Sequence, residues 1–429
     1  WIISGTQSTV TAGTSNYIAG VNAGNSIASG GNYNVTIGDE AGTAITTGDN
    51  NTFVGYAAGD ATTTAIENTA VGGSALGANT TGAANTALGI NSLVANTTAA
   101  NNTAVGRSSL ESNTTGTANT AMGKDALQGN TTADNNTAVG YLALEANTTG
   151  ASNVAVGSLA LDANTTGATN VAVGTSAMGA NTTGGNNVAV GVNSLDANTT
   201  GDENTALGDG ALSANTTADK NVAVGARTML INTTGTSNVA VGYEALEVNT
   251  TASNNTAVGY QALTANTTGT RNTAVGTSAG AAITTGGNNT VMGYNALATN
   301  TVGDRNVAIG EGALQTHNPS SNADTYNVAV GYDAGNAVTT GVQNTLIGGL
   351  AGDALTEADA NVAIGKGALT TDTLGSSSVA VGNNALTNQN FTSATDTYNV
   401  AVGKNAGLSM TTGTENTFVG GLAGDAATT

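Results

Sequence analysis

The chain contains almost none of the residues from which catalytic and metal sites are usually built. Among its 429 residues there is no cysteine and one histidine, His317. The lack of cysteine excludes disulfide bonds and thiolate metal sites. A single histidine cannot form a His-based metal cluster, and His317 lies beside Pro319 in an irregular stretch where we expect a spacer. We therefore predict that the protein is not an enzyme and has no catalytic residues, no cofactor and no metal site.

Charge is also scarce, and most of it has one sign. Charged residues make up 8% of the chain, with 28 acids against eight scattered bases and a net charge of −20. Such a surface has no basic patch for nucleic acid or an anionic membrane, and no apolar run approaches the roughly 18 residues of a membrane span. We expect neither partner and no membrane insertion. Acid pairs such as Asp202 with Glu203, or Asp353 with Glu357, leave a glycan-cleaving, tailspike-like enzyme as a remote alternative.

What the chain has in abundance is a repeat. A glycine that closes the phrase Asn-Thr/Val-Ala-Val-Gly recurs at 24 positions, and almost all intervals are 17 residues, as at Gly140, Gly157 and Gly174. A disordered tract would not hold its apolar residues at fixed places in a period. Each unit of such an array is one turn of a stack that cannot bury its apolar side alone.

The composition of one repeat predicts its local structure. The Thr/Val-Ala-Val run is short and β-branched and lies between Asn and Gly, so it predicts a strand. We expect the following Ala-Leu segment to form a second short strand and Asn-Thr-Thr-Gly to form the return turn. The sequence thus predicts an all-β protein, a parallel β-solenoid (β-roll) of about 24 coils with 17 residues per coil, shaped as an elongated rod.

Two asparagines recur at fixed places in the repeat. One lies four residues before the glycine, and the other lies seven residues after it in twelve successive coils. Stacked amides can bond to the coils above and below, so we predict structural ladders, with a ligand role as the alternative. The first ladder includes Asn136, Asn153, Asn170 and Asn187, and the second includes Asn147, Asn164 and Asn181. The second Asn is followed by Thr-Thr, which makes a formal glycosylation sequon, as at Asn79, Asn96, Asn113 and Asn147.

Two core positions exchange size along the array. The residue four after the glycine is usually Leu, and the residue two before the next glycine is usually Ala. Where Gly replaces the Leu of two neighbouring coils, a large residue replaces the Ala between them. The three sets are Gly42, Phe53 and Gly59; Gly335, Leu346 and Gly352; and Gly407, Phe418 and Gly424. Because close-packed layers tolerate swaps that conserve volume, we predict that the two positions share one compartment.

The residue just before the repeat glycine is large and apolar in almost every coil, as at Val139, Val156 and Leu207. Side chains alternate along a strand, so it must face away from the buried Ala. Both faces of the strand are therefore apolar, which indicates a second buried surface. We predict homo-oligomers, with a lateral sheet or bundle contact as the alternative.

The array divides into three stretches. Residues 1–20 are degenerate and suggest a cap or joint, residues 21–310 hold the regular array, and residues 311–429 include two 21-residue coils. We expect the extra residues, which include 317–319 and 389–391, to bulge as loops. Residues 33–38 resemble residues 398–403, which suggests that copies could continue one another end to end as a filament.

Two kinds of residue could serve binding at the surface. Paired threonines such as Thr148 with Thr149 recur above one another, and a flat Thr array is an alternative ice-binding surface. Six tyrosines directly follow the repeat glycine; we expect them to pack over the turn, with glycan contact as the alternative. They are Tyr56, Tyr141, Tyr243, Tyr260, Tyr294 and Tyr332.

The phrase at residues 136–150 and 255–269, Asn-Thr-Ala-Val-Gly-Tyr followed by Ala-Leu and Asn-Thr-Thr-Gly, resembles the repeats of phage tail-fibre-like and bacterial surface-fibre proteins. It is also similar to the shorter head repeats of YadA-like trimeric autotransporter adhesins. The resemblance implies a trimeric β-roll that projects from a surface and binds a host or substratum. We therefore expect a structural fibre subunit, extracellular or on a virion or cell surface, with surface glycan as a candidate ligand.

Overall fold

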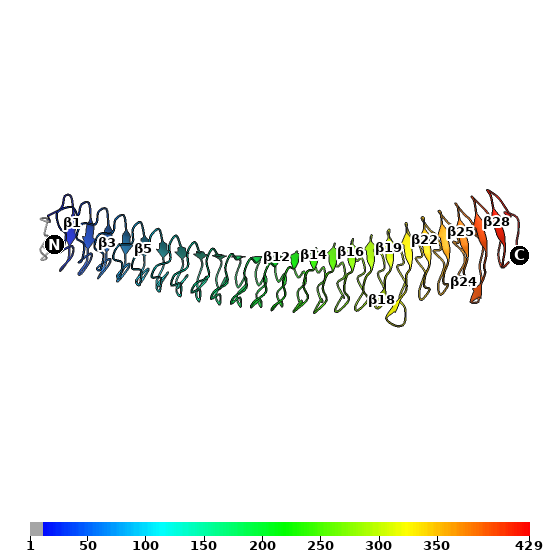
Figure 1. Ribbon diagram of the computed structural model, residues 1–429, viewed down its shortest axis with the longest axis horizontal. Coiled ribbons are helices and arrows are strands. Elements are labelled where there is room, and N and C mark those ends of the chain that lie inside the picture. Colours follow the sequence, from blue (N-terminus) through cyan, green and yellow to red (C-terminus); the bar gives the residue numbers. More distant parts are fainter. Residues whose placement is uncertain (1–11) are drawn as a thin grey trace, which may run out of the picture. The chain divides into compact units, whose positions relative to one another are not determined.

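The computed structural model describes residues 12–429, and every regular element among them is a β-strand. Strands of three residues recur at the 17-residue interval and pair in parallel with the strand of the next coil, forming a stack of coils (Figure 1). The predicted fold class, a parallel β-solenoid of about 24 coils, is confirmed. Residues 1–11, which include Trp1 of the expected cap, lie outside the described part of the chain.

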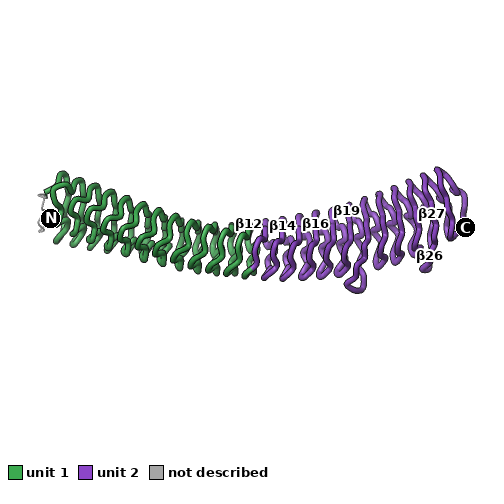
Figure 2. The backbone as a smooth tube through the Cα atoms, in the orientation of Figure 1, with its two compact units in different colours: residues 1–217 green, residues 218–429 purple. Residues whose placement is uncertain are grey.

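The chain divides into two compact units, up to Thr217 and from Ala218 onward (Figure 2). The strands of unit 1 are β1 (Tyr17–Ala19), β2 (Val35–Ile37), β3 (Thr52–Val54), β4 (Thr69–Val71), β5 (Thr86–Leu88), β6 (Thr103–Val105), β7 (Thr120–Met122), β8 (Thr137–Val139), β9 (Val154–Val156), β10 (Val171–Val173), β11 (Val188–Val190) and β12 (Thr205–Leu207). Within this unit the register is one residue to one residue; Ala155 of β9, for example, lies beside Ala172 of β10.

Unit 2 repeats the same construction and adds two pairs of short strands, each of which joins a long coil to the coil before it. Its three-residue strands are β13 (Val222–Val224), β14 (Val239–Val241), β15 (Thr256–Val258), β16 (Thr273–Val275), β17 (Thr290–Met292), β19 (Val307–Ile309), β21 (Val328–Val330), β22 (Thr345–Ile347), β23 (Val362–Ile364), β25 (Val379–Val381), β27 (Val400–Val402) and β28 (Thr417–Val419). The short strands are β18 (Gly303–Asp304) with β20 (Ala323–Asp324), and β24 (Gly375–Ser376) with β26 (Thr395–Asp396).

The repeat glycine ends each strand because no other residue fits there. Gly140 has φ +144°, and a Cβ on it would lie 2.3 Å from the carbonyl oxygen of Gly157 in the next coil. An L-residue disfavours this backbone conformation, and the close approach of two coils leaves no room for a side chain. The 17-residue glycine is thus a requirement of stacking.

The Ala-Leu segment is not the second strand that the sequence predicts. It is a tight turn in which two residues per coil adopt the left-handed conformation, for example Leu142 and Leu144, both at φ 57°. Such residues bend the backbone too sharply for a strand. The turn still bonds to its neighbour, since Leu144 N donates to Ala160 O at 2.9 Å.

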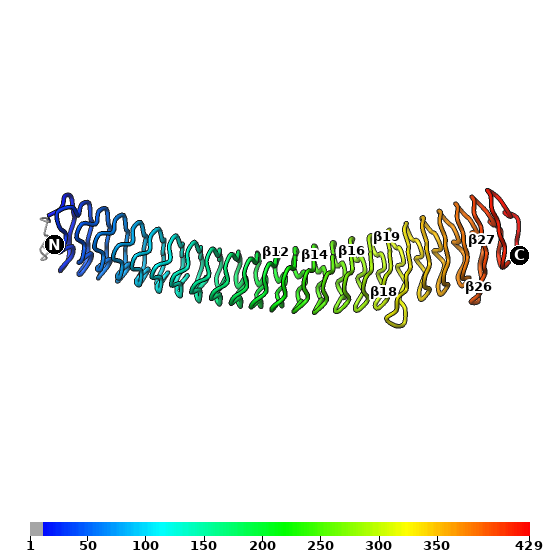
Figure 3. The backbone as a smooth tube through the Cα atoms, in the orientation of Figure 1, coloured from blue at the N-terminus to red at the C-terminus, as the bar shows by residue number. Residues whose placement is uncertain are grey.

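The two long coils extend differently from the prediction. Their exposed bulges are residues 320–322 and 392–394, whereas His317, Gln389 and Phe391 are buried. Figure 3 shows the first long coil looping out from the stack near β18. His317 and Gln389 each lie seven residues after a repeat glycine, so they occupy the place of the second Asn instead of acting as spacers.

Candidate assembly surface

The first asparagine ladder is confirmed. Asn136, Asn153 and Asn170 are fully buried; Asn136 Oδ1 accepts the backbone N–H of Asn153, and Asn153 Oδ1 accepts that of Asn170, both at 2.9 Å. The amide nitrogen of Asn153 also donates to Gly167 O at 2.9 Å. Each side chain therefore forms hydrogen bonds with backbone groups that lie outside the strands. These bonds matter because buried polar groups need hydrogen-bond partners.

The second ladder uses the amides differently. Asn164 Nδ2 donates both to Asn147 Oδ1 at 2.9 Å and to Gly167 O at 3.0 Å. The ladder is continuous from Asn79 to Asn215 in unit 1. In unit 2 it ends at Asn266, whose Oδ1 has no partner because the next position is Ile283.

These contacts correct the glycosylation hypothesis. Attachment of a glycan requires an accessible amide nitrogen, and these four amides are fully buried with their nitrogens engaged. The residues concerned are Asn79, Asn96, Asn113 and Asn147. In the folded chain these sequons are structural.

The exchanged core residues touch one another. Phe53 is fully buried between Gly42 and Gly59, where a Cβ would lie 3.1 Å and 2.6 Å from its ring. In unit 2 the same construction recurs twice. A Cβ on Gly335 or Gly352 would lie 2.6 Å or 2.8 Å from Leu346, and one on Gly407 or Gly424 would lie 3.1 Å or 2.2 Å from Phe418.

A third position, which the sequence prediction did not include, takes part in this exchange. In each coil where Gly replaces the core Leu, the second-ladder Asn is also replaced, mostly by an aliphatic residue such as Ile45, Val338 or Leu355. The side chain of Ile45 turns toward the missing Leu, since a Cβ on Gly42 would lie 2.7 Å from its Cδ1. The signal was present as covariation among the repeats.

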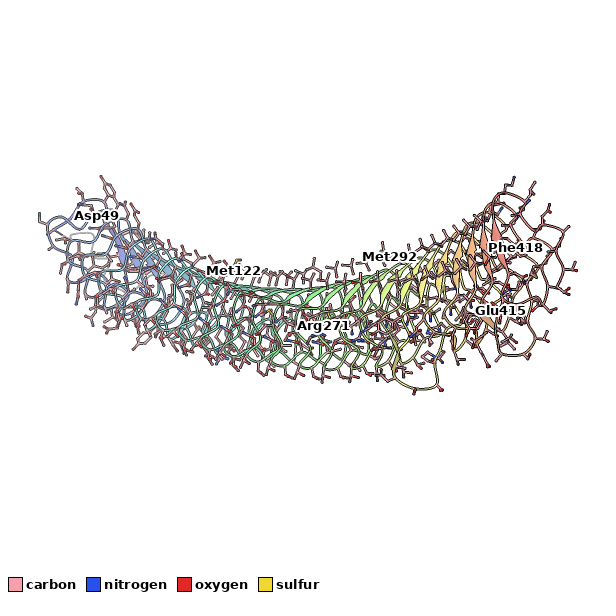
Figure 4. All side chains as sticks on the ribbon, turned by 45° about the vertical axis from the view of Figure 1, so that its right-hand side comes forward. Asp49, Met122, Arg271, Met292, Glu415 and Phe418 are labelled. Atoms are coloured by element: carbon pink, nitrogen blue, oxygen red, sulfur yellow. The ribbon has the colours of Figure 1, made fainter. Side chains whose placement is uncertain are left out.

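The strands carry an exposed surface, which we call the outer face: the side chains of the first and third residues of each three-residue strand. The third residues are all apolar, and the first residues are Val or Thr in all strands but β1. The middle residue points into the coil and is buried in nearly all strands, whereas Val190, Leu207 and Met122 are 38%, 37% and 45% exposed. In Figure 4, the labelled Met122 and Met292 project from their strands away from the coil interior. The middle and third side chains of each strand thus point in opposite directions, as predicted.

Charge is excluded from the outer face. No first or third residue of these 24 strands is Asp, Glu, Lys or Arg. The charged groups lie before or beyond the strands instead; beyond them, for example, Lys124 pairs with Asp125 at 2.9 Å and Arg227 pairs with Glu247 at 2.5 Å.

The tyrosines that follow the repeat glycine do not pack over the turn as expected. All six are 44–66% exposed. Tyr243 and Tyr260 stack on each other, with ring centroids 5.7 Å apart, and Lys124 lies 5.2 Å from the ring of Tyr141. These exposed rings lie two residues after the last residue of the preceding strand, next to the outer face.

The residues considered for chemistry do not assemble into a site. Asp202 accepts the backbone N–H of Gly185, and Asp353, whose pKa is raised by burial, accepts a bond from Thr370. Burial lowers the pKa of His317 to about 4, and neither ring nitrogen has a hydrogen-bond partner. Within residues 12–429, no three metal-ligating side chains gather together.

No protein-family model matches the chain, and no curated protein matches its sequence. A search of the described residues for a helix that is long and apolar enough to cross a membrane finds none.

Proposed function

We propose that this chain is a structural subunit of a fibre that is extracellular or exposed on a virion or cell. Copies associate side by side, as the trimer implied by the repeat phrase, and they can extend end to end. The observation that carries the proposal is the outer face: an apolar, charge-free surface that continues from strand to strand on the outside of an array whose interior is already filled.

The interior supports a mechanical role. The same amide bonds and the same small core residues recur in coil after coil, as in Asn147 to Asn198. Repeats that contact only their neighbours build extended surfaces of constant geometry. A uniform spacing of similar units is what a fibre needs.

Electron microscopy of the native material tests the proposal directly. We expect thin fibres or bundled rods, and light scattering of the purified chain should give a mass of three copies. Isolated single-chain particles at every concentration would reject the assembly role.

An ice-binding role is the alternative that one observation favours. The first Thr of each Asn-Thr-Thr is engaged, since Thr148 Oγ1 donates to Thr165 O at 3.0 Å, but Thr149 and Thr166 are exposed. A rank of single threonines, one per coil, therefore remains at the surface. Thermal hysteresis would support ice binding, a glycan array would test adhesion through the exposed tyrosines, and glycan release would support the enzyme alternative.

A further inference from the structure

We infer that the outer face is the surface on which copies of this chain meet, parallel and in register, so that each outward residue packs against the same residue of another copy. The inference rests on the proposed lateral association and identifies its surface and its geometry. The occupant of the outer face is thus another copy of this chain.

The composition of the face points to such a partner. An apolar face without charges must meet an apolar surface, because a partner's charge would lose its hydration without gaining an opposite charge. The partner must also carry its side chains at the spacing of the coils, about 4.8 Å, for the two surfaces to interdigitate. The same face of a second copy meets both conditions.

The area is sufficient for a stable contact. Twelve strands spaced about 4.8 Å apart make the outer face of one unit about 58 Å long, and three residues make it about 10 Å wide. Two such faces would remove about 1,200 Å² from solvent, which exceeds the roughly 1,000 Å² expected of a specific interface. One unit alone therefore provides enough surface.

The order of the first strand residues favours parallel packing. In unit 1 these residues form a run of Thr from β3 to β8 and a run of Val from β9 to β11. In-register packing sets Thr opposite Thr and Val opposite Val. Reversal of one copy about the middle of the unit would instead place Thr52 opposite Val171 and Thr69 opposite Val154.

The threonine hydroxyls make the parallel arrangement lower in free energy than the reversed one. Thr52 is half-buried and Thr69 is exposed, and neither Oγ1 makes a hydrogen bond within the described chain. Buried against Val they would remain unpaired, which is unfavourable, whereas two facing hydroxyls can bond to each other. Parallel copies therefore give these hydroxyls hydrogen-bond partners, which antiparallel copies would not.

Spin labels test the register. Because the chain has no cysteine, Ile90→Cys, Tyr141→Cys and Val192→Cys each introduce a single attachment point just beyond a strand, three coils apart. In-register copies should give short label-to-label distances in all three variants. Copies reversed about the middle of the unit would separate the labels by three coils in the first two variants and by nine coils in the third, and such unequal distances would overturn the register.

Charge substitutions test the surface. Val190→Lys, on the outer face, should convert the assembly to single chains, while Thr183→Lys, exposed in the adjacent coil on another side, should leave it intact. Circular dichroism should show that both variants remain folded, since neither side chain is in the core. An assembly that survives Val190→Lys would reject this surface but leave lateral association standing. A wild-type chain that is monomeric at all concentrations would reject both.

Discussion

At the scale of single residues, the coil depends on side chains that act as extra backbone. Asn and Gly supply what three-residue strands cannot: the amides close the bonds of the turns, and the glycines allow neighbouring coils to approach. The ladder asparagines, although polar, are therefore core residues. Removal of one amide affects the coils on both sides.

Asn164→Ala should be strongly destabilising. It removes the donor of Asn147 Oδ1 and one of the two donors of Gly167 O, which keeps its bond from Asn153, and it takes one acceptor from Asn181. With about 1–3 kcal/mol for each buried group left unpaired, we expect a loss of about 2–4 kcal/mol. Urea unfolding measures it. Thr166→Ala, exposed in the same turn, is the control and should change stability by less than about 0.5 kcal/mol.

His317→Asn should remove a step in the acid sensitivity of unit 2. Burial holds the pKa of His317 at about 4, below its ordinary 6.5, so the unfolded chain binds a proton that the folded chain does not. Stability is therefore complete above pH 6.5, falls as the pH drops toward 4 and is level below it. The difference in unfolding midpoint between wild type and variant, measured from pH 7 to pH 4, should follow this curve. A constant difference would contradict the titration of His317.

At the scale of the coil, the sequence predicted the strand, its register and the Asn ladders, because these depend on residues that recur unchanged. The period of the glycine located every three-residue strand, though not the four short ones, and the alternation around Ala172 located both faces. The turn after the glycine was not predictable from composition. Leu144 in a left-handed conformation is stable because stacking fixes the backbone, and an isolated Ala-Leu segment would be read as a strand.

The candidate surface was predictable in part for the same reason. Alternation placed Val156 and Leu207 outward, but exposure of the tyrosines depends on turn geometry that the sequence pattern does not specify. The position of His317 was missed because Pro319 marked the segment as irregular. Counting seven residues from Gly310 would have placed His317 on the ladder.

The size exchange predicts a favourable coupling between two substitutions. Phe53→Ala should cost about 3–5 kcal/mol because it leaves a cavity, and Gly59→Leu should be unfavourable because a Cβ alone would lie 2.6 Å from the ring. Together they restore the Ala and Leu combination of most coils. The double variant should therefore be more stable than the sum of the single effects predicts, by more than about 1 kcal/mol. Additive effects in denaturant unfolding would show that the positions do not share space.

At the scale of the whole molecule, the chain combines an uncharged outer face with a net charge of −20. On the proposed association, copies brought side by side would repel through their acids and attract through the outer face. The balance between the two depends on ionic strength, because salt screens the first and leaves the second.

Association should therefore increase with salt. We expect sedimentation to show tighter assembly in about 0.5 M sodium chloride than at low salt, because the Debye length is then only a few ångströms. Val190→Lys should remain monomeric across the range. Weaker assembly of the wild type at high salt would indicate contacts between opposite charges and would contradict an apolar interface.

The bonds between coils also determine how force would pass through a unit. Backbone groups, amides and threonine hydroxyls of one coil all bond to the next coil, as Val154 N to Asn170 O, Asn164 Nδ2 to Asn147 Oδ1 and Thr148 Oγ1 to Thr165 O do. Tension applied evenly across a coil loads these bonds together, whereas a pull on one chain end loads them one after another. The same coil is thus strong under stretching and weak under peeling, and side-by-side copies would protect it by sharing the load.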